Sequence, residues 1–250
     1  MSTNLDANSW HALNLELIAF PVEAVPDQDQ DWWRDLTGER GESLRRSTSR
    51  VDSGAFRGVA FRLELDLLRI RWAIGKLVAQ DAEVLTSAPD IGPYQEAVEW
   101  FAPVMGEWLR TSAPPLKRLA FAGKVIRWTG SREESYAVLA DCLRDSVKVD
   151  PQSREFQYRV NRPRSSAMGI EDFNINRLCT WSAVTLNVTV QATTGSTTRQ
   201  LERPWDGCLL QLDINTPVDR AIPIPPDRLV AAWEELVSLG NEIAIRGDIP

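Results

Sequence analysis

The fold is decided by residues 59–74, which read VAFRLELDLLRIRWAI. The apolar positions share one parity up to residue 67 and the other parity from residue 68: Phe61, Leu63, Leu65 and Leu67, then Leu68, Ile70, Trp72 and Ile74. A period of two predicts a half-buried strand. Because one regular strand cannot change face, a β-bulge or a tight bend must separate two segments at Leu67–Leu68.

The same alternation predicts further strands along the chain. They cover residues 12–20, 116–128, 156–160, 184–190, 198–203 and 208–214. Thr193–Thr198 contains a glycine between two of these strands, which is typical of a hairpin loop. Short strands joined by turns favour an antiparallel sheet.

Helical periodicity appears between the strands. Residues 93–110 place Ala97, Phe101, Met105 and Trp108 on one face. Ser131 and Glu134 have the spacing of a capping box, which predicts a helix of about four turns burying Tyr136, Leu139, Ala140 and Leu143. A last helix begins near Pro226, and a short one is expected at Trp32–Trp33.

These elements predict an α+β fold, with mainly antiparallel sheet or sheets and three main amphipathic helices. The 250 residues fit a single globular domain over 1–250. A long helix follows strand pairs twice, so two related lobes, about 1–130 and 131–250, are the alternative arrangement.

Charge and cysteine content limit the classes of partner. The net charge is −7 and the isoelectric point is about 5.0, so non-specific binding to nucleic acid is disfavoured. Binding of nucleic acid in a local basic groove is the alternative. No apolar stretch reaches the ~18 residues that a membrane helix needs. Three widely spaced cysteines and no signal peptide indicate the cytoplasm.

The common catalytic constellations are missing from the sequence. His11 is the single histidine, and we interpret it as a surface residue. One histidine without a close cysteine pair cannot form a usual zinc site, and no phosphate-binding glycine motif is present. We therefore expect no metal, no cofactor and no catalytic residue.

The most unusual segment is Tyr158–Ser166, which reads YRVNRPRSS. Arginines beside hydroxyls and loop amides can hold a phosphate or a carboxylate. The candidate residues for an anion-binding or partner-binding site are Arg159, Arg162, Arg164, Ser165 and Arg177. The alternative is that these arginines and nearby carboxylates neutralise one another.

Two further polar groups have weaker functional interpretations. Asp66, Asp172 and Asp213 are the carboxylates from which a magnesium or acid–base cluster would be built, although strand alternation turns Asp66 and Asp213 toward solvent. The basic run Arg45–Arg50 is expected to be a solvated loop, with phosphate binding or modification as the alternative.

Ten tryptophans are present, and four of them lie at element ends, off any clear core phase. These four are Trp32, Trp33, Trp181 and Trp205. Exposed tryptophan is enriched in protein interfaces, so they are interface candidates, and capping of a large core is the alternative.

Two stretches support a resemblance to a known family. The run Leu116–Ile126, LKRLAFAGKVI, and the ending Cys208–Asn215, CLLQLDIN, followed by a helix from Asp227, resemble an uncharacterised, sporadically distributed bacterial family of about this length. The resemblance covers half of the chain and no catalytic motif. It implies an α+β fold with no known activity, and its sporadic distribution implies mobile or antiviral-defence genes.

Three functions follow from these observations, in order of preference. The first is a non-catalytic protein-interaction subunit or accessory of a bacterial complex, in antiviral defence if the resemblance holds. The second is a binding module for a phosphorylated small molecule or nucleotide through Arg159, Arg162 and Arg164. The third is a metal-dependent hydrolase or nuclease that uses Asp172 and Asp213.

Overall fold

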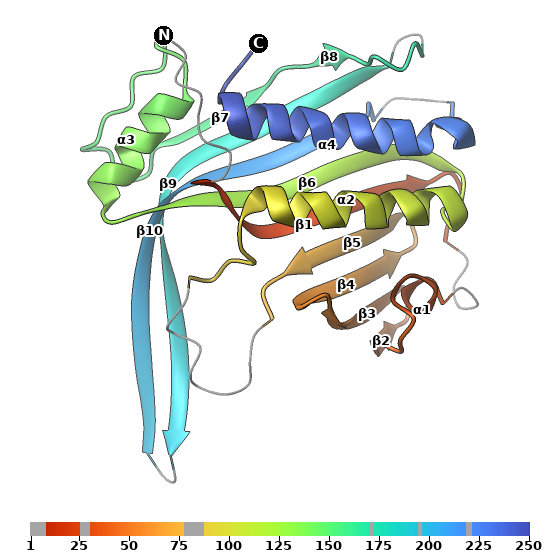
Figure 1. Cartoon of the computed structure of the whole chain (residues 1–250), viewed down its shortest axis with the longest axis horizontal. Helices are drawn as coiled ribbons and strands as arrows, with labels where there is room; N and C mark the ends of the chain where they lie inside the picture. Colours follow the sequence, from red (N-terminus) through yellow and green to blue (C-terminus); the bar gives the residue numbers. More distant parts are fainter. Residues whose placement is uncertain (1–8, 26–30, 78–87, 171–172, 195–196, 219–221) are drawn as a thin grey trace.

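A computed structural model describes residues 9–25, 31–77, 88–170, 173–194, 197–218 and 222–250, with backbone alone over 188–194 and 197–202. These residues form one large antiparallel sheet with four α-helices on one of its faces (Figure 1). The α+β fold class predicted from the sequence is therefore confirmed.

The described elements fall into two halves with the same order: a strand, a helix, four strands and a helix. The first half contains β1 (His11–Pro21), α1 (Trp32–Thr37), β2 (Glu42–Arg46), β3 (Ser49–Phe56), β4 (Val59–Asp66), β5 (Arg69–Gly75) and α2 (Tyr94–Thr111). The second contains β6 (Leu116–Thr129), α3 (Arg132–Cys142), β7 (Gln157–Asn161), β8 (Arg164–Ser165), β9 (Asn174–Thr194), β10 (Thr197–Asn215), a 3-10 turn (Pro226–Arg228) and α4 (Leu229–Arg246). The order starts again at β6, after α2.

The two halves join through their first strands. The strand order is β2-β3-β4-β5-β1-β6-β10-β9-β7, so β1 and β6 lie side by side at the centre. Their register pairs Leu17 with Phe121, and β5 and β10 flank them on either side. In the second half β7 and β8 pair with successive segments of β9, so they share one edge position.

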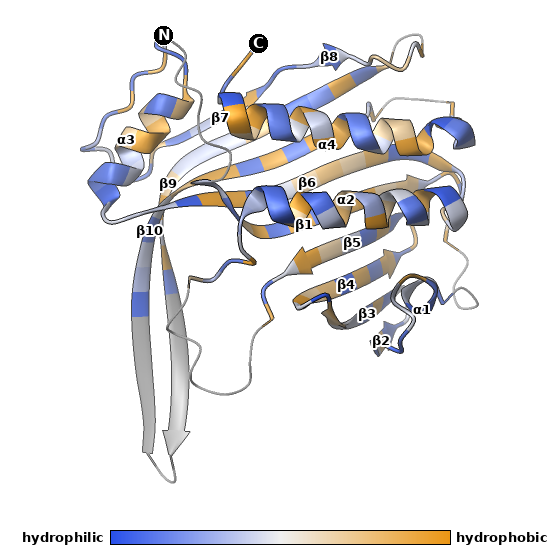
Figure 2. Cartoon of the chain, viewed as in Figure 1, coloured by the Kyte–Doolittle hydropathy of each residue, from blue (hydrophilic) through white to orange (hydrophobic). Residues whose placement is uncertain are grey.

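Alternation along the central strands separates a core face from a polar face. Leu15, Leu17 and Ala19 of β1 are buried beneath the helices. Figure 2 shows hydrophobic and hydrophilic residues alternating along these strands and around α2 and α4. The opposite side of the sheet is called the open face here, because no described helix covers it. The side chains that alternate with the buried ones point to this face, and they include Glu16, Lys124 and Gln211.

Aromatic rings link the helices to the first half of the sheet. Trp33 of α1 contacts Phe61, Phe61 stacks on Trp72, and Trp72 meets Trp108 of α2, with ring centroids 5.4, 5.2 and 5.9 Å apart. Trp32 completes this aromatic chain against Trp108 at 5.6 Å. Such rings bury large apolar areas, so they fix both helices on the sheet.

The parity change at Leu67–Leu68 is a tight bend between β4 and β5. The side chain of Asp66 accepts a hydrogen bond from the Leu68 amide (3.0 Å), which closes the turn. Leu67 and Leu68 are 52% and 66% exposed. Of the two explanations predicted for this site, the bend is the one that the structure confirms.

Several local predictions were wrong. The basic run Arg45–Arg50, expected as a loop, lies in the hairpin of β2 and β3. The strands expected at 198–203 and 208–214 are one strand, β10. Helix α3 ends at Cys142, and its Ala140 is exposed, although Ser131 caps the helix as predicted by accepting from the Glu134 amide at 3.2 Å.

The β9–β10 hairpin continues well beyond the sheet. β10 pairs with β6 only from Asp206 onward, while its pairing with β9 runs out to Thr197–Thr194. The part from Trp205–Leu186 to Thr197–Thr194 is called the arm. It projects from the body of the molecule as a two-stranded ribbon (Figure 1).

Candidate functional site

The arginine-rich segment encloses the end of the described chain. Arg162 donates two hydrogen bonds to the Asp248 carboxylate, from Nε at 2.5 Å and from Nη2 at 2.7 Å. The Tyr158 hydroxyl donates a third at 3.0 Å. Asp248 follows α4 directly, so these bonds fasten β7 to the end of that helix. We call this group the Asp248 clamp.

Ionisation of Asp248 is favoured by its partners. Burial raises the pKa of this carboxyl, but the hydrogen bonds from Arg162 and Tyr158 and the positive charge of Arg162 outweigh that effect. The pKa of Asp248 therefore lies below its usual value. The Arg162 pKa is raised, chiefly by its hydrogen bond to Asp248, so both members stay charged.

Three other candidates of this segment also have partners within the chain. Arg164 donates to Glu242 Oε2 at 2.8 Å, and Ser165 donates to Asn174 Oδ1 at 3.1 Å. Arg177 is buried and donates to the main-chain oxygen of Pro250 at 3.0 Å. Burial, followed by the charge of Arg164, lowers the pKa of Arg177. In the described structure each of these three candidates is therefore hydrogen-bonded to another part of the chain itself.

Arg159 is separated from the rest by strand alternation. Tyr158 and Arg162 contact Asp248 beneath the helices, while Arg159 points to the open face and is exposed. Its guanidinium has no hydrogen-bond or ion-pair partner among the described residues. The same period of two that predicted β7 would have separated Arg159 from Arg162 and Arg164.

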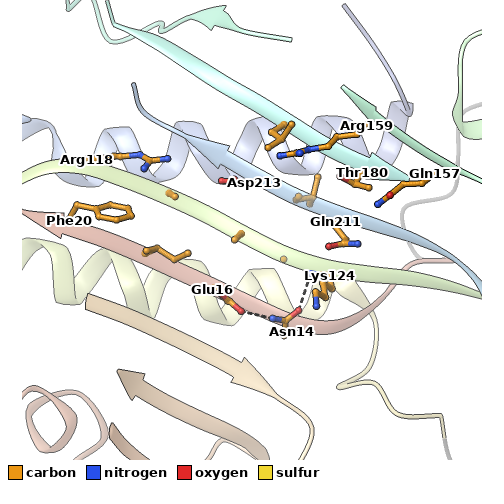
Figure 3. Close-up of a pocket in the computed structure, with 16 residues that line it drawn as sticks. Asn14, Glu16, Phe20, Arg118, Lys124, Gln157, Arg159, Thr180, Gln211 and Asp213 are labelled. Carbon is orange, nitrogen blue, oxygen red and sulfur yellow. Dashed lines mark hydrogen bonds between the residues drawn. The ribbon is translucent and has the colours of Figure 1, made fainter. Parts of the chain in front are cut away.

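A hollow of about 520 Å³ lies on the open face beside Arg159 (Figure 3). Its lining comes from β1, β6, β10, β9 and β7. Strand register places five polar residues in one row across these strands: Asn14, Lys124, Gln211, Thr180 and Arg159. Neighbouring strands are ~4.8 Å apart, so Lys124 and Arg159 flank a span of ~14 Å.

Two carboxylates of the hollow already have partners. Glu16 accepts from Arg71 Nε at 2.8 Å and from Asn14 Nδ2 at 2.6 Å. Asp213 accepts a hydrogen bond from Asn215 Nδ2 at 2.9 Å. Arg118 lies toward the far end, with its guanidinium 4.8 Å above the Phe20 ring. Lys124 has no described hydrogen-bond or ion-pair partner for its ammonium group.

Three of the four tryptophan interface candidates are core residues. Trp32 and Trp33 are 3% exposed, and Trp181 is fully buried against Trp10, with ring centroids 6.1 Å apart. Side chains at the ends of a short helix can point toward the core, and both tryptophans of α1 point toward the sheet. These three side chains form no exposed surface of the described chain.

Trp205 differs, because it is half-buried where the arm leaves the sheet. Its ring lies 5.7 Å from that of Trp128, and the Arg203 guanidinium lies 4.3 Å above it. We call Trp128, Arg203 and Trp205 the arm root. A shallow cavity of about 500 Å³ adjoins it, lined in part by Glu134, Val138 and Asp141.

His11 belongs to the same end of the molecule. Its Nδ1 lies 3.2 Å from Asp90 Oδ1, and Asp90 Oδ2 accepts from the Trp128 indole at 2.6 Å. Asp90 also accepts from the Gly92 amide at 2.9 Å. These contacts join the start of β1 to the arm root.

The carboxylate cluster expected for metal chemistry is not assembled in the described part of the chain. Asp172 lies outside the described residues. Asp66 closes the β4–β5 bend, whereas Asp213 lies in the hollow. No group of three or more histidine, cysteine or acidic residues suited to a metal ion occurs among the described residues.

Comparisons with known proteins found no match to a family model, a curated protein or a solved structure. This result is consistent with the resemblance to an uncharacterised family that has no known activity. Within the described ranges, none of the helices has both the length and the apolar character required to cross a bilayer.

Proposed function

We propose that this protein is a non-catalytic interaction protein that binds another protein through its arm and arm root. The observation that carries the proposal is the arm itself, in which β9 and β10 pair with each other and with no other described strand. It continues for about nine residue pairs, or ~30 Å. A lone two-stranded ribbon is marginally stable in water, because it buries little surface.

The backbone of the arm suits recognition of an extended partner segment. Past Ser182 on β9 and Asp206 on β10, the outer edges of both strands pair with no other described strand. Free edges bind added strands, which is a common mode of peptide recognition. Pro204 removes one donor on β10, so the β9 edge offers the more regular surface.

The arm root supplies side chains of the kind that contribute most to binding energy. Tryptophan and arginine are enriched among residues whose truncation weakens protein complexes. Trp205 and Trp128 contact each other and hold the base of the arm on the body. The buried indole nitrogen of Trp205 has no hydrogen-bond partner among the described atoms.

The cellular setting is part of the same proposal. Three free, buried cysteines fit a reducing compartment, so we place the complex in the cytoplasm. A role as an accessory subunit in antiviral defence rests on the family resemblance alone.

The test uses a shortened arm in which Asn-Gly replaces residues 189–202 and joins Val188 to Arg203, which face each other in the ribbon. Tagged wild-type and shortened proteins are purified from the native host, and a co-purifying protein is identified by mass spectrometry. Its affinity is then measured with both purified components. We expect at least about tenfold weaker binding by the shortened protein.

Point variants separate the arm root from general charge effects. Arg203→Glu should weaken the same complex, whereas Arg154→Glu, a matched change at an exposed arginine outside the arm, should not. Equal affinity of the wild-type and shortened proteins for the partner, or no stoichiometric partner at all, would overturn the proposal.

A further inference from the structure

We propose that the hollow on the open face binds a phosphorylated sugar derivative, the chemical class that includes mononucleotides and sugar phosphates. The proposal goes beyond the protein interaction described above, since it concerns another surface and another class of ligand. It also differs from the phosphate site expected from the sequence, because only Arg159 is common to both sets of residues.

The hollow is more cationic than the chain as a whole. The whole chain carries a net charge of −7, yet the hollow contains Arg118, Lys124 and Arg159 and only two carboxylates. One of these, Glu16, is held by Arg71, whose pKa is raised chiefly by this hydrogen bond. A locally cationic hollow on an acidic protein favours an anionic ligand.

The charged groups of Lys124 and Arg159 are available to a ligand. Lys124 and Arg159 extend from β6 and β7, with β10 and β9 between them, and both side chains are exposed. Neither the Lys124 ammonium nor the Arg159 guanidinium has a hydrogen-bond or ion-pair partner in the described structure, in contrast to the guanidinium groups of Arg162 and Arg164. Lysine and arginine hydrogen-bond phosphate oxygens strongly when they are free to reach them.

The uncharged polar groups and the carboxylate of the hollow favour a phosphosugar over a simple anion. Between the two cations lie the hydroxyl of Thr180 and the amide of Gln211, and Asp213 follows two residues after Gln211 (Figure 3). A carboxylate repels phosphate but accepts hydrogen bonds from sugar hydroxyls. A ligand that combines phosphate with hydroxyls satisfies both kinds of group.

The size and floor of the hollow agree with a small molecule. A volume of about 520 Å³ lies within the ~300–1,000 Å³ of ligand sites. Ala120, Ala122 and Gly123 of β6 line it, so little side-chain volume rises from the central strand. A ring can therefore approach the sheet over β6, between Lys124 and Arg118.

The test measures binding to the purified full chain by isothermal titration calorimetry. The probes are adenosine and uridine monophosphate, glucose 6-phosphate, inorganic phosphate, adenosine, glucose and a short single-stranded RNA. We expect at least one phosphosugar to bind, and its unphosphorylated counterpart and inorganic phosphate to bind at least about tenfold more weakly, because each lacks one kind of contact.

Two matched double variants locate the site. Lys124→Gln/Arg159→Gln should weaken phosphosugar binding roughly 100-fold, since each charged hydrogen bond contributes about tenfold or more. Lys117→Gln/Arg154→Gln removes the same charge from exposed residues outside the hollow and should leave affinity within about twofold.

A third variant, Ala122→Leu, fills the hollow without removing a charge, and we expect it to abolish phosphosugar binding. Circular dichroism melting of each variant checks that the fold is kept. Binding by none of the phosphosugars at millimolar concentration would overturn the proposal, as would equal losses in the two double variants. Binding of the RNA alone would replace the small molecule with a nucleic acid.

The arm-shortened protein keeps the two proposals apart. The shortening removes none of the residues that line the hollow, so this variant should bind the same phosphosugar as the wild type. Loss of ligand binding in that variant would contradict the assignment to the open face, whatever the outcome for the protein partner.

Discussion

Individual residues of the Asp248 clamp show how a charged group can serve the fold. The Asp248 side chain is almost fully buried, and it is compensated by two hydrogen bonds from Arg162 and one from Tyr158. Removing one member of such a group leaves the others without a partner, which costs more than the net value of the bond. The clamp therefore holds β7 to the end of α4.

We expect Asp248→Asn to lower the free energy of unfolding by about 1–3 kcal/mol at pH 7. The folded pKa of Asp248 lies below the unfolded value of ~3.9, so its contribution is present above that value and is lost as the pH falls through the folded pKa. The difference between wild type and variant should therefore shrink on acidification. Urea unfolding of both proteins at neutral pH and near pH 3 measures it, and a difference that stays constant or grows would contradict the clamp.

The sequence identified some of these residues as candidates for a site, but it did not predict which residues they contact. Alternation along residues 156–160 places Arg159 opposite Tyr158, which separates the open-face arginine from the clamp. The partner of Arg162 lies 86 positions away along the chain, and no local pattern links the two. The hollow shares this property, because its polar row joins residues from β1, β6, β10, β9 and β7.

At the scale of elements, two glycines mark how closely the long helices pack. A Cβ on Gly106 of α2 would lie 3.9 Å from Val230 and 4.0 Å from Trp233, which are ordinary contacts. A Cβ on Gly240 of α4 would lie 2.7 Å from the buried Phe121 ring. The close approach of α4 to β6 therefore depends on glycine, while that of α2 to α4 does not.

Substitution of each of these glycines by alanine should change stability, and the two changes should have opposite signs. Gly106→Ala should raise the free energy of unfolding by ~0.5–1 kcal/mol, because alanine stabilises a helix interior relative to glycine. Gly240→Ala has the same helix gain but overpacks the contact with Phe121, so we expect a net loss of ~1–2 kcal/mol. Denaturant unfolding compares them directly, and shifts of the same sign would contradict this packing.

The elements that the sequence revealed are those with one buried face. The helix at 93–110 and the strands at 12–20 and 116–128 were predicted correctly, because burial imposes a clear period on them. β2 was missed because all of its residues are exposed, so its sequence carries no apolar alternation. β8 comprises only Arg164–Ser165, which is too short to show any period.

At the scale of the whole molecule, the two halves share one sheet and one core. β1 pairs with β6 along most of its length, and α2 contacts α4. Trp10 of the first half meets Trp181 of the second, and Phe101 meets Trp233 at 6.2 Å. Separation of the halves would expose all of these contacts together.

We therefore expect one cooperative unfolding transition for the full chain, although it is longer than most two-state domains. Urea unfolding followed by circular dichroism and by the radius of gyration from X-ray scattering should give coincident midpoints. Two resolved transitions would show that each half is stable without its neighbour.

Sequence patterns could not predict the order of the strands in the sheet. The sequence suggested two related lobes from its repeated helices, but the pairing of β1 with β6 joins segments about a hundred positions apart. Antiparallel neighbours that distant are chosen by complementary packing of the complete chain.

The aromatic chain from Trp32 to Trp33 has an optical consequence. Rings at such short separations exchange excitation energy, so a photon absorbed by one indole is emitted from the member with the lowest excited state. Trp72 occupies the middle of this relay and Trp108 connects it to α1. The emission of the four tryptophans in this aromatic chain therefore depends on the assembled rings, and removing Trp72 alone should change the native spectrum by more than that residue's share of the absorbance.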